Sequence, residues 1–468
     1  MKIFSNEIVF RGHPDKVCDQ ISDALLDAYL SEDKSSRCGI EVMGGKGKIF
    51  VTGEVTSSAK VNVSSIVKRV LNDVGYDENY EIINNLGVQS IDIALGTNDK
   101  VHGAGDNGMM FGYACRDTKE YLPTSMVILQ KLSIFYDELR KKDKRFLPDG
   151  KAQITGYYEN NKLVKIKDFV ICYQNTEEER DKTDEILINT CKSICNEYNI
   201  EVEKFILNPT GKFLIGGFTG DAGLTGRKIV VDSYQGFAPV GGGAFSGKDP
   251  SKVDRSGAYM ARVIAKDILK NNDNLEYVLV QLSYAIGLKN PLAIYITSDK
   301  GDLKVPDDLY EKCSVQNIIN SLNLLNEKYE KRAMFGHFKD WFFWTLINCI
   351  IFSFNCIILY SNDAIELIKK IIIIKIISEM NITMTKTNDI SFKYENLKGK
   401  FNFRVTAFIQ NGEKLLLQKS DKDSFYGLIG GRVSFGETTF EAIIREVNEE
   451  TGVTLNDEKL LEHLIIMD

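Results

Sequence analysis

The sequence lacks the patterns that mark disulfide-bonded and zinc-binding proteins. Its nine cysteines form no C-x-x-C pair, and the nearest two, Cys191 and Cys195, have no histidine beside them. The N-terminus has too short an apolar run, and no small-residue cleavage site, for a secretory signal. An odd cysteine count in such a chain is typical of reduced thiols. We therefore expect a cytoplasmic protein with neither a disulfide framework nor a structural zinc site.

An excess of positive charge is also lacking. The chain has 58 Lys and Arg residues against 65 Asp and Glu residues, a net charge of −7. This balance argues against a general nucleic-acid-binding protein, although basic groups can still gather locally. With 468 residues, of which 43% are hydrophobic and 26% charged, the chain is long enough for several globular domains.

Proline is absent from the last part of the chain, and this marks a break in composition. All eight prolines precede residue 341, both tryptophans follow at 341 and 344, and residues 341–362 carry no charge. An isoleucine-rich run continues this segment to about residue 379. Three interpretations are open: a membrane span, a buried linker helix, or a non-functional joint between two units. We favour the joint, with a second unit over 380–468, and consider membrane insertion the weaker alternative.

Before the break the pattern mixes helix and strand. Residues 13–30 are predicted to form a helix, with Pro14 in its first turn and apolar residues at helical spacing. Four aspartates fall every fourth residue on another face; we interpret Asp23 and Asp27 as solvated, and Asp15 as part of a site. Strands are expected at 48–55, 169–173, 213–216, 228–231 and 278–283. Without regular βαβ spacing, this order favours an α+β fold.

Glycine-rich, charged segments indicate a polyphosphate site. GGGAFSGKDPSKVDR, residues 241–255, combines glycines that permit close backbone approach with lysines for phosphate and carboxylates for Mg²⁺. RGHPDK (11–16), GAGDNG (103–108) and GDAGLTGRK (220–228) add further cations and carboxylates. Residues 242–249 come close to a P-loop, but Asp249 stands where Ser or Thr is required.

Together these segments, with NPTGKFLIGG, resemble methionine adenosyltransferase, the S-adenosylmethionine synthase family, over about residues 1–340. The resemblance implies three similar α+β domains in a pseudo-threefold arrangement, expected at 1–100, 101–214 and 215–340. It implies formation of S-adenosylmethionine from ATP and L-methionine, with cleavage of the triphosphate to phosphate and pyrophosphate. Two Mg²⁺ per site, K⁺, and a homodimer or homotetramer with the active site between subunits are also implied.

The resemblance assigns a role to each matching residue. The expected catalytic groups are His13, Arg227, Lys248 and Lys252. The expected ATP ligands are His13, Lys16, Lys151, Asp221, Arg227, Lys228, Ala244 and Lys248. The expected methionine contacts are Glu54, Leu95, Asp106, Asp221 and Lys252. Asp15 and Asp254 are expected to hold Mg²⁺, and Glu41 to hold K⁺.

The sequence departs from the family pattern at several positions. Arg11 stands in place of a usual Glu, Asn107 in place of a Gln, and Pro239–Val240 in place of a step ending in His. Two alternatives therefore stay open: an adenosyltransferase for another thioether, and a non-catalytic ATP-binding subunit.

Leu95 replaces a Gln that contacts methionine in the family. A leucine side chain cannot make the hydrogen bonds of an amide. We predict a raised KM for methionine and a lower KM in Leu95→Gln, measured from initial rates of product formation. Unchanged methionine kinetics in Leu95→Gln would contradict this account.

A second motif lies in the tail. GRVSFGETTFEAIIREVNEETGV, residues 431–453, resembles the Nudix hydrolase box, which acts on nucleoside diphosphates linked to another group. Glu446 and Glu450 fall four apart on one helical face with Glu449 beside them, a natural Mg²⁺ site. Only about fifteen residues follow the box, so we expect a partial domain with little activity by itself.

Overall fold

The computed structural model describes residues 1–89 and 103–338, and beyond them only the backbone of six short strands between residues 391 and 432. The chain divides into two units, Met1–Ile347 and Asn348–Asp468, which are described separately. The candidate site residues between positions 1 and 340 belong to the first unit. Of these, Leu95 lies outside the described residues.

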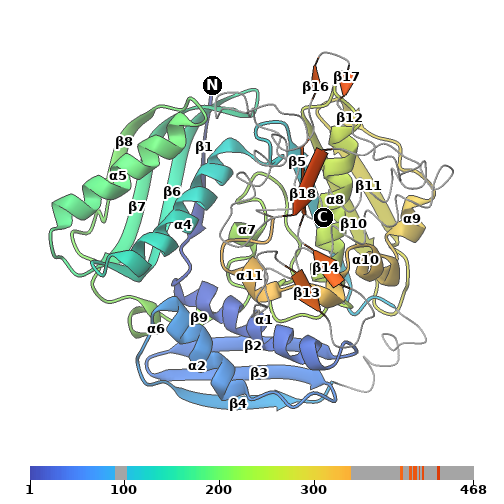
Figure 1. Cartoon of the computed structure of the whole chain (residues 1–468), viewed down its shortest axis with the longest axis horizontal. Helices are drawn as coiled ribbons and strands as arrows, with labels where there is room; N and C mark the ends of the chain where they lie inside the picture. The colour runs from blue at the N-terminus through green and yellow to red at the C-terminus, as the bar shows by residue number, and fades with distance from the viewer. Residues whose placement is uncertain are drawn as a thin grey trace. The chain divides into compact units, whose positions relative to one another are not determined.

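Three four-stranded sheets organise the first unit, as Figure 1 shows. The first sheet has the order β4 (Glu81–Gly87), β3 (Lys48–Thr56), β2 (Arg37–Gly45) and β9 (Gly223–Leu224). The second has the order β1 (Lys2–Val9), β6 (Phe146–Glu159), β7 (Lys162–Asn175) and β8 (Val202–Leu207). The third has the order β12 (Gly301–Asp302), β11 (Ala293–Ser298), β10 (Tyr277–Tyr284) and β5 (Gly108–Cys115). Within these sheets β3–β4 and β7–β8 pair in parallel and the other neighbours pair antiparallel.

The sheets interleave segments that are far apart in the sequence. β1 pairs with β6 in the second sheet, from Lys2 opposite Tyr158 to Val9 opposite Lys151. β5 joins the third sheet through β10, and β9 joins the first through β2. The expected segments 1–100, 101–214 and 215–340 thus exchange edge strands, because each sheet completes its hydrogen bonding with a strand from a neighbouring segment. The family expectation of three similar α+β domains is confirmed.

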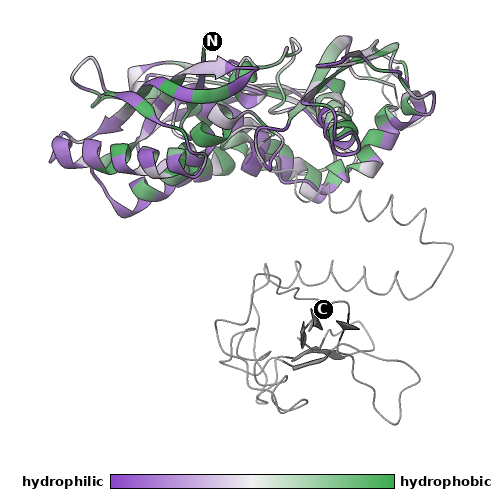
Figure 2. Ribbon diagram, turned by 90° about the horizontal axis from the view of Figure 1, so that it is seen from above, coloured by the Kyte–Doolittle hydropathy of each residue, from purple (hydrophilic) through white to green (hydrophobic). Residues whose placement is uncertain are grey.

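Amphipathic helices cover one face of each sheet. α1 (Pro14–Glu32) and α2 (Val63–Val74) pack on the first sheet, α4 (Thr124–Lys142) and α5 (Arg180–Asn196) on the second, and α8 (Val253–Lys270) on the third. α2 shows why: Val63, Val67, Val70, Leu71 and Val74 are its buried side chains and form one stripe at helical spacing. Hydrophilic and hydrophobic segments alternate along the ribbons of this unit in Figure 2, as such one-sided burial requires.

Short helices fill the connections. They are α6 (Gly217–Gly220), α7 (Ile229–Asp232), α9 (Leu309–Lys312), α10 (Val315–Ser321), the 3-10 helix η1 (Leu324–Asn326) and α11 (Tyr329–Ala333). The predicted helix over 13–30 and the predicted strands at 48–55, 169–173 and 278–283 are confirmed. The strands predicted at 213–216 and 228–231 are wrong: the first is a loop and the second is mostly α7. The β-branched run in α7 favours a strand locally, and tertiary packing overrides that preference.

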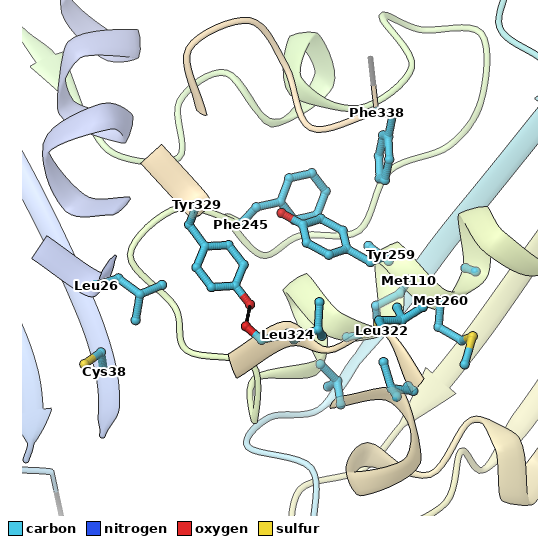
Figure 3. Packing of buried hydrophobic residues seen from close by; sticks show 14 of the residues in the cluster. Leu26, Cys38, Met110, Phe245, Tyr259, Met260, Leu322, Leu324, Tyr329 and Phe338 are labelled. Carbon is cyan, nitrogen blue, oxygen red and sulfur yellow. Dashed lines mark hydrogen bonds between the residues drawn. The ribbon is translucent and has the colours of Figure 1, made fainter. Parts of the chain in front are cut away.

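An aromatic cluster closes the core near the end of the first unit (Figure 3). Tyr329 donates its hydroxyl to the Leu324 carbonyl at 2.6 Å, and the Phe338 ring stacks on Tyr234 with centroids 4.8 Å apart. Phe245 and Tyr259 complete the cluster, each with ring centroids about 6 Å from Phe338. The chain therefore contributes to this core up to residue 338.

Within residues 1–89 and 103–338, no helix is both long enough and apolar enough to cross a membrane. The apolar segment 341–379, to which the membrane interpretation applied, lies outside the described residues. In the second unit the backbone forms three antiparallel pairs: β13 (Ser391–Lys393) with β14 (Lys400–Asn402), β15 (Arg404–Ala407) with β18 (Ile429–Arg432), and β16 (Gln410–Asn411) with β17 (Lys414–Leu415).

Candidate active site

A first group of charged residues gathers at the N-terminus of α1. His13 is the N-cap of this helix, and its Nδ1 accepts a hydrogen bond from the Asp15 N–H at 3.2 Å. Burial, followed by the charge of Lys228, lowers the pKa of His13 to about 4. The imidazole is therefore neutral at pH 7. Because Nδ1 is an acceptor, the proton resides on Nε2, which can donate to an anionic oxygen.

Asp15 connects this helix end to the loop that carries two cations. Its Oδ1 accepts from the Leu224 N–H at 3.0 Å, and its Oδ2 lies 2.5 Å from Lys228 Nζ. Arg227 Nε is 3.5 Å from Oδ1, and its side chain is about half exposed. A carboxylate expected to bind Mg²⁺ is thus neutralised by the cations expected to bind phosphate.

The outer face of the second sheet borders this group. Lys151 lies on β6, exposed, with Nζ 3.6 Å from the Glu7 carboxylate. A cavity of about 450 Å³ is lined by Glu7, Gln153, Arg227 and Lys228 together with neighbouring residues. This is enough room for part of a nucleotide next to the cations.

Asp149 is a buried carboxylate that the sequence analysis did not single out. Its Oδ2 accepts from the Gly217 N–H at 2.8 Å. Burial raises the pKa of Asp149 to about 6, and the nearby carboxylates of Asp221 and Asp15 add to this. Asp149 therefore belongs to the first group, with Asp221. Its position two residues before Lys151 in PDGKAQ was the signal that could have found it.

A second group gathers where the glycine-rich segment meets α8. Lys248 Nζ lies 2.5 Å from Asp254 Oδ2, and Lys252 Nζ lies 2.5 Å from Asp249 Oδ2. A Cβ on Gly243 would lie 2.1 Å from the Asp254 carboxyl carbon, so a larger residue there would have to displace this carboxylate. Asp249 is fully buried and also accepts from the backbone of β2.

Three expected methionine-site residues lie around this second group. Gly39 on β2 forms an isolated β-bridge with Lys248 on one side. On its other side it pairs with Glu54 of β3, so Glu54 lies one strand away from Lys248. Glu54 accepts from Gln89 Nε2 at 3.1 Å. Asp106 follows Gly105, whose N–H donates to the Ser251 carbonyl at 3.3 Å, next to Lys252. Glu41, expected to bind K⁺, is exposed on β2 opposite Thr52.

Two expected ATP ligands have other surroundings. Lys16 is about 1% exposed, and its ammonium pairs with Asp19 at 3.1 Å and with Asp232. The structure thus places Lys16 in a buried cluster with Asp19 and Asp232. Ala244 lies against Gly226, since a Cβ built on Gly226 would be 2.6 Å from the Ala244 Cβ.

The ion pairs of the two groups lie within each group. Among the described residues, no ion pair joins Arg227 or Lys228 of the first group to a carboxylate of the second group, and none joins Lys248 to a carboxylate of the first. Each group contains cations and a carboxylate of the kinds that a polyphosphate site with Mg²⁺ needs. Leu95 and the Nudix-box residues Glu446, Glu449 and Glu450 lie outside the described residues.

The surroundings of Arg11 and Asn107 explain how two departures from the family pattern are accommodated. Arg11 Nε donates to Gln20 Oε1 at 2.8 Å, and Nη1 lies 3.5 Å from Asp137. Asn107 Oδ1 accepts from the Ile286 N–H at 2.7 Å. The structure offers no explanation for Val240.

The carboxylates of the candidate site fit Mg²⁺ only if a substrate supplies further oxygen ligands. No group of three or more His, Cys, Asp or Glu side chains within 1–89 and 103–338 forms a self-sufficient metal site. Mg²⁺ usually binds one or two carboxylates and takes its other ligands from phosphates and water. Single carboxylates such as Asp15 and Asp254, each beside a lysine expected to bind phosphate, match that pattern.

The fold and the paired groups define a class: an α+β enzyme of three related domains with a polyphosphate site. Family models of the S-adenosylmethionine synthetase N-terminal, central and C-terminal domains match residues 1–95, 101–213 and 215–345. The S-adenosylmethionine synthase of Mycoplasmopsis synoviae is 42% identical over 356 residues, covering 72% of this chain and 92% of that protein. That of Clostridium tetani is 40% identical over 373 residues, covering 72% and 94%. The chain belongs to the S-adenosylmethionine synthase family.

The tail has a separate match. A NUDIX domain model matches residues 400–465, which confirms the resemblance found at residues 431–453.

Proposed function

We propose that this chain forms S-adenosylmethionine from ATP and L-methionine, as a methionine adenosyltransferase. The observation that carries the proposal, besides family membership, is the pair of matching contacts Asp15–Lys228 and Asp254–Lys248. In each, a carboxylate suited to Mg²⁺ lies beside a lysine suited to phosphate.

The chemistry explains this arrangement. The methionine sulfur attacks C5′ of ATP, and the whole triphosphate leaves, later to be cleaved to phosphate and pyrophosphate. A neutral thioether needs no general base, so the enzyme must position the reactants and stabilise the charge that develops on the leaving group. Arg227, Lys228 and Lys248 supply fixed positive charge, and the neutral His13 donates from Nε2. Mg²⁺, when bound, adds Lewis-acid stabilisation of the phosphate oxygens.

On substrate binding, these lysines and carboxylates exchange one another for phosphate and metal. In the structure, Lys228 neutralises Asp15 and Lys248 neutralises Asp254. With ATP and Mg²⁺, we propose that each lysine moves to phosphate and each carboxylate to metal. Two Mg²⁺, one for each carboxylate, and K⁺ near Glu41 are the expected ions; the family uses a divalent metal and K⁺. Methionine is expected at Glu54, Asp106 and Lys252.

We also propose a homodimer or homotetramer with the active site between subunits. In this arrangement we place the second group of one subunit against the first group of its partner. The outer sheet faces also expose large apolar side chains: Met43 and Phe50 on the first sheet and Met109 and Tyr295 on the third. Such patches are typical of subunit contacts. The cytoplasmic location stays a prediction.

The test is product formation. Full-length protein with ATP, methionine, Mg²⁺ and K⁺ is expected to yield S-adenosylmethionine, detected by mass spectrometry, and omission of Mg²⁺ should abolish it. Methionine replaced by ethionine or another thioether tests the alternative substrate. Binding of ATP with no product from any thioether would favour the non-catalytic subunit and overturn the proposal.

Residues 1–340 alone are expected to be soluble and to match the full-length rate. The described core ends at Phe338, which is about 1% exposed, and both charge groups precede it. Rates of the two proteins, compared at equal site concentration, check this. A truncated protein that folds but is inactive would show that the tail contributes to the site, contrary to the joint interpretation of 341–379.

A further inference from the structure

Four aspartates on one face of α1 each accept a backbone hydrogen bond from outside that helix. We call Asp15, Asp19, Asp23 and Asp27 the aspartate row; they recur every fourth residue and so share a helix face. The acceptor–donor pairs are Asp15 with Leu224 at 3.0 Å, Asp19 with Gly226 at 2.9 Å, Asp23 with Gly247 at 2.9 Å, and Asp27 with Tyr329 at 2.9 Å and Glu330 at 3.1 Å. The interpretation of Asp23 and Asp27 as a solvated face is therefore wrong.

Asp19 holds the loop of the first charge group. Its donor, the Gly226 N–H, immediately precedes Arg227 and Lys228. Asp19 is fully buried, and Lys16 Nζ lies 3.1 Å from its Oδ2. A buried carboxylate is tolerated only when it is paired and hydrogen-bonded, so this geometry is tightly specified. Asp19 itself cannot reach a substrate.

Asp23 holds the loop of the second charge group in the same way. Its donor, the Gly247 N–H, immediately precedes Lys248. The Asp23 Oδ1 also accepts from Arg255 Nη2 at 2.5 Å, and both side chains are fully buried. Gly247 has a φ of 81°, and a Cβ there would lie 1.9 Å from the Ile40 carbonyl oxygen. The turn that presents Lys248 is therefore closely packed against α1 and β2.

Asp27 does the same for a segment without site residues. It accepts from the first backbone N–H groups of α11, which carries none of the expected ATP, methionine or metal ligands. The row thus contains its own control position.

We propose that Asp19 and Asp23 are positioning residues for catalysis, which hold Arg227 and Lys228, and Lys248, where they meet the triphosphate. The proposal rests on the proposed function and adds two residues to it. They act through the loops, because both are shielded from solvent. Misplacement of a catalytic group by about 1 Å can cost about 10²-fold in rate.

Double-mutant cycles test the assignment of each aspartate to its own loop. Asp19→Ala and Asp23→Ala are each expected to lower kcat/KM about 10²-fold, mostly through kcat. Asp19→Asn and Asp23→Asn should recover part of the loss, since an amide oxygen still accepts the loop N–H. In the Lys228→Ala background the effect of Asp19→Ala should shrink to about 10-fold or less, while in Lys248→Ala it should persist in full. Asp23→Ala should show the opposite pattern.

Binding of inorganic tripolyphosphate with Mg²⁺, measured by calorimetry, gives a readout that does not depend on product formation. It should weaken in the Asp19 and Asp23 variants and not in Asp27→Ala, which is expected to lower Tm yet keep kcat/KM within about twofold. Weaker tripolyphosphate binding in the Asp19 and Asp23 variants would support the positioning roles even if no product formed, a result that would refute the proposed function alone. If the alanine variants do not fold, the asparagine variants carry the same cycles. Equal coupling to both lysines, or an equal activity loss in Asp27→Ala, would overturn the inference.

Discussion

Lys228→Ala and Lys248→Ala are each expected to lower kcat/KM by about 10²–10³-fold, the usual cost of removing one preorganised group that stabilises developing charge. Each lysine belongs to a different charge group and is partly shielded from solvent, with 18% of the Lys228 side chain and 23% of the Lys248 side chain exposed. The charge on the triphosphate grows as its bond to C5′ breaks. The loss should therefore appear in kcat as well as in KM for ATP, measured from initial rates at saturating methionine.

Lys162→Ala is the matched control. Lys162 also pairs with a carboxylate, Glu276, at 2.7 Å, but its side chain is 51% exposed and it belongs to neither charge group. Its removal should leave kcat/KM unchanged, because exposed ion pairs contribute little. A loss below about threefold in Lys228→Ala or Lys248→Ala would contradict a role in leaving-group stabilisation.

A mixed oligomer of these two inactive variants is expected to regain activity. If each site combines the first group of one subunit with the second group of its partner, a Lys228→Ala/Lys248→Ala heterodimer has one site with both lysines intact and one with neither. Heterodimers isolated through two different affinity tags should thus show roughly half of the wild-type activity per dimer. S-adenosylmethionine formation at equal dimer concentration is the measurement.

Heterodimers prepared from two differently tagged Lys228→Ala chains serve as the control and should stay inactive. A mixed dimer that is as inactive as its parents would show that one subunit supplies both groups.

The glycine-rich motifs predicted the chemistry because their chemistry is local. GDAGLTGRK and GGGAFSGKDPSKVDR each contain cations, carboxylates and the glycines that let a backbone pass close to them, as Gly243 does at Asp254. The family, its fold and its activity could be inferred from such segments. The helix over 13–30 could be predicted equally well, because Pro14 and the apolar spacing are local properties of this segment.

The burial of the aspartate row could not be predicted from the sequence, for a physical reason. A row of carboxylates at helical spacing has the same pattern whether it faces water or a set of backbone N–H groups. Only the loops at Gly226, Gly247 and Tyr329, more than 200 residues away, convert it into a buried docking face. The helix at 229–232 was missed likewise, because its β-branched residues favour a strand until packing decides otherwise.

By itself, then, the sequence determined the types of group present in this enzyme: cations suited to phosphate, carboxylates suited to Mg²⁺ and the glycines between them. The tertiary structure alone decided which carboxylate neutralises which lysine, that Lys16 is buried with Asp19 and Asp232, and that Lys228 and Lys248 pair with different carboxylates. Residue types and spacings are encoded along the chain. Partners, burial and separation are set by long-range contacts, in which strands and loops from distant segments complete each sheet and dock on α1.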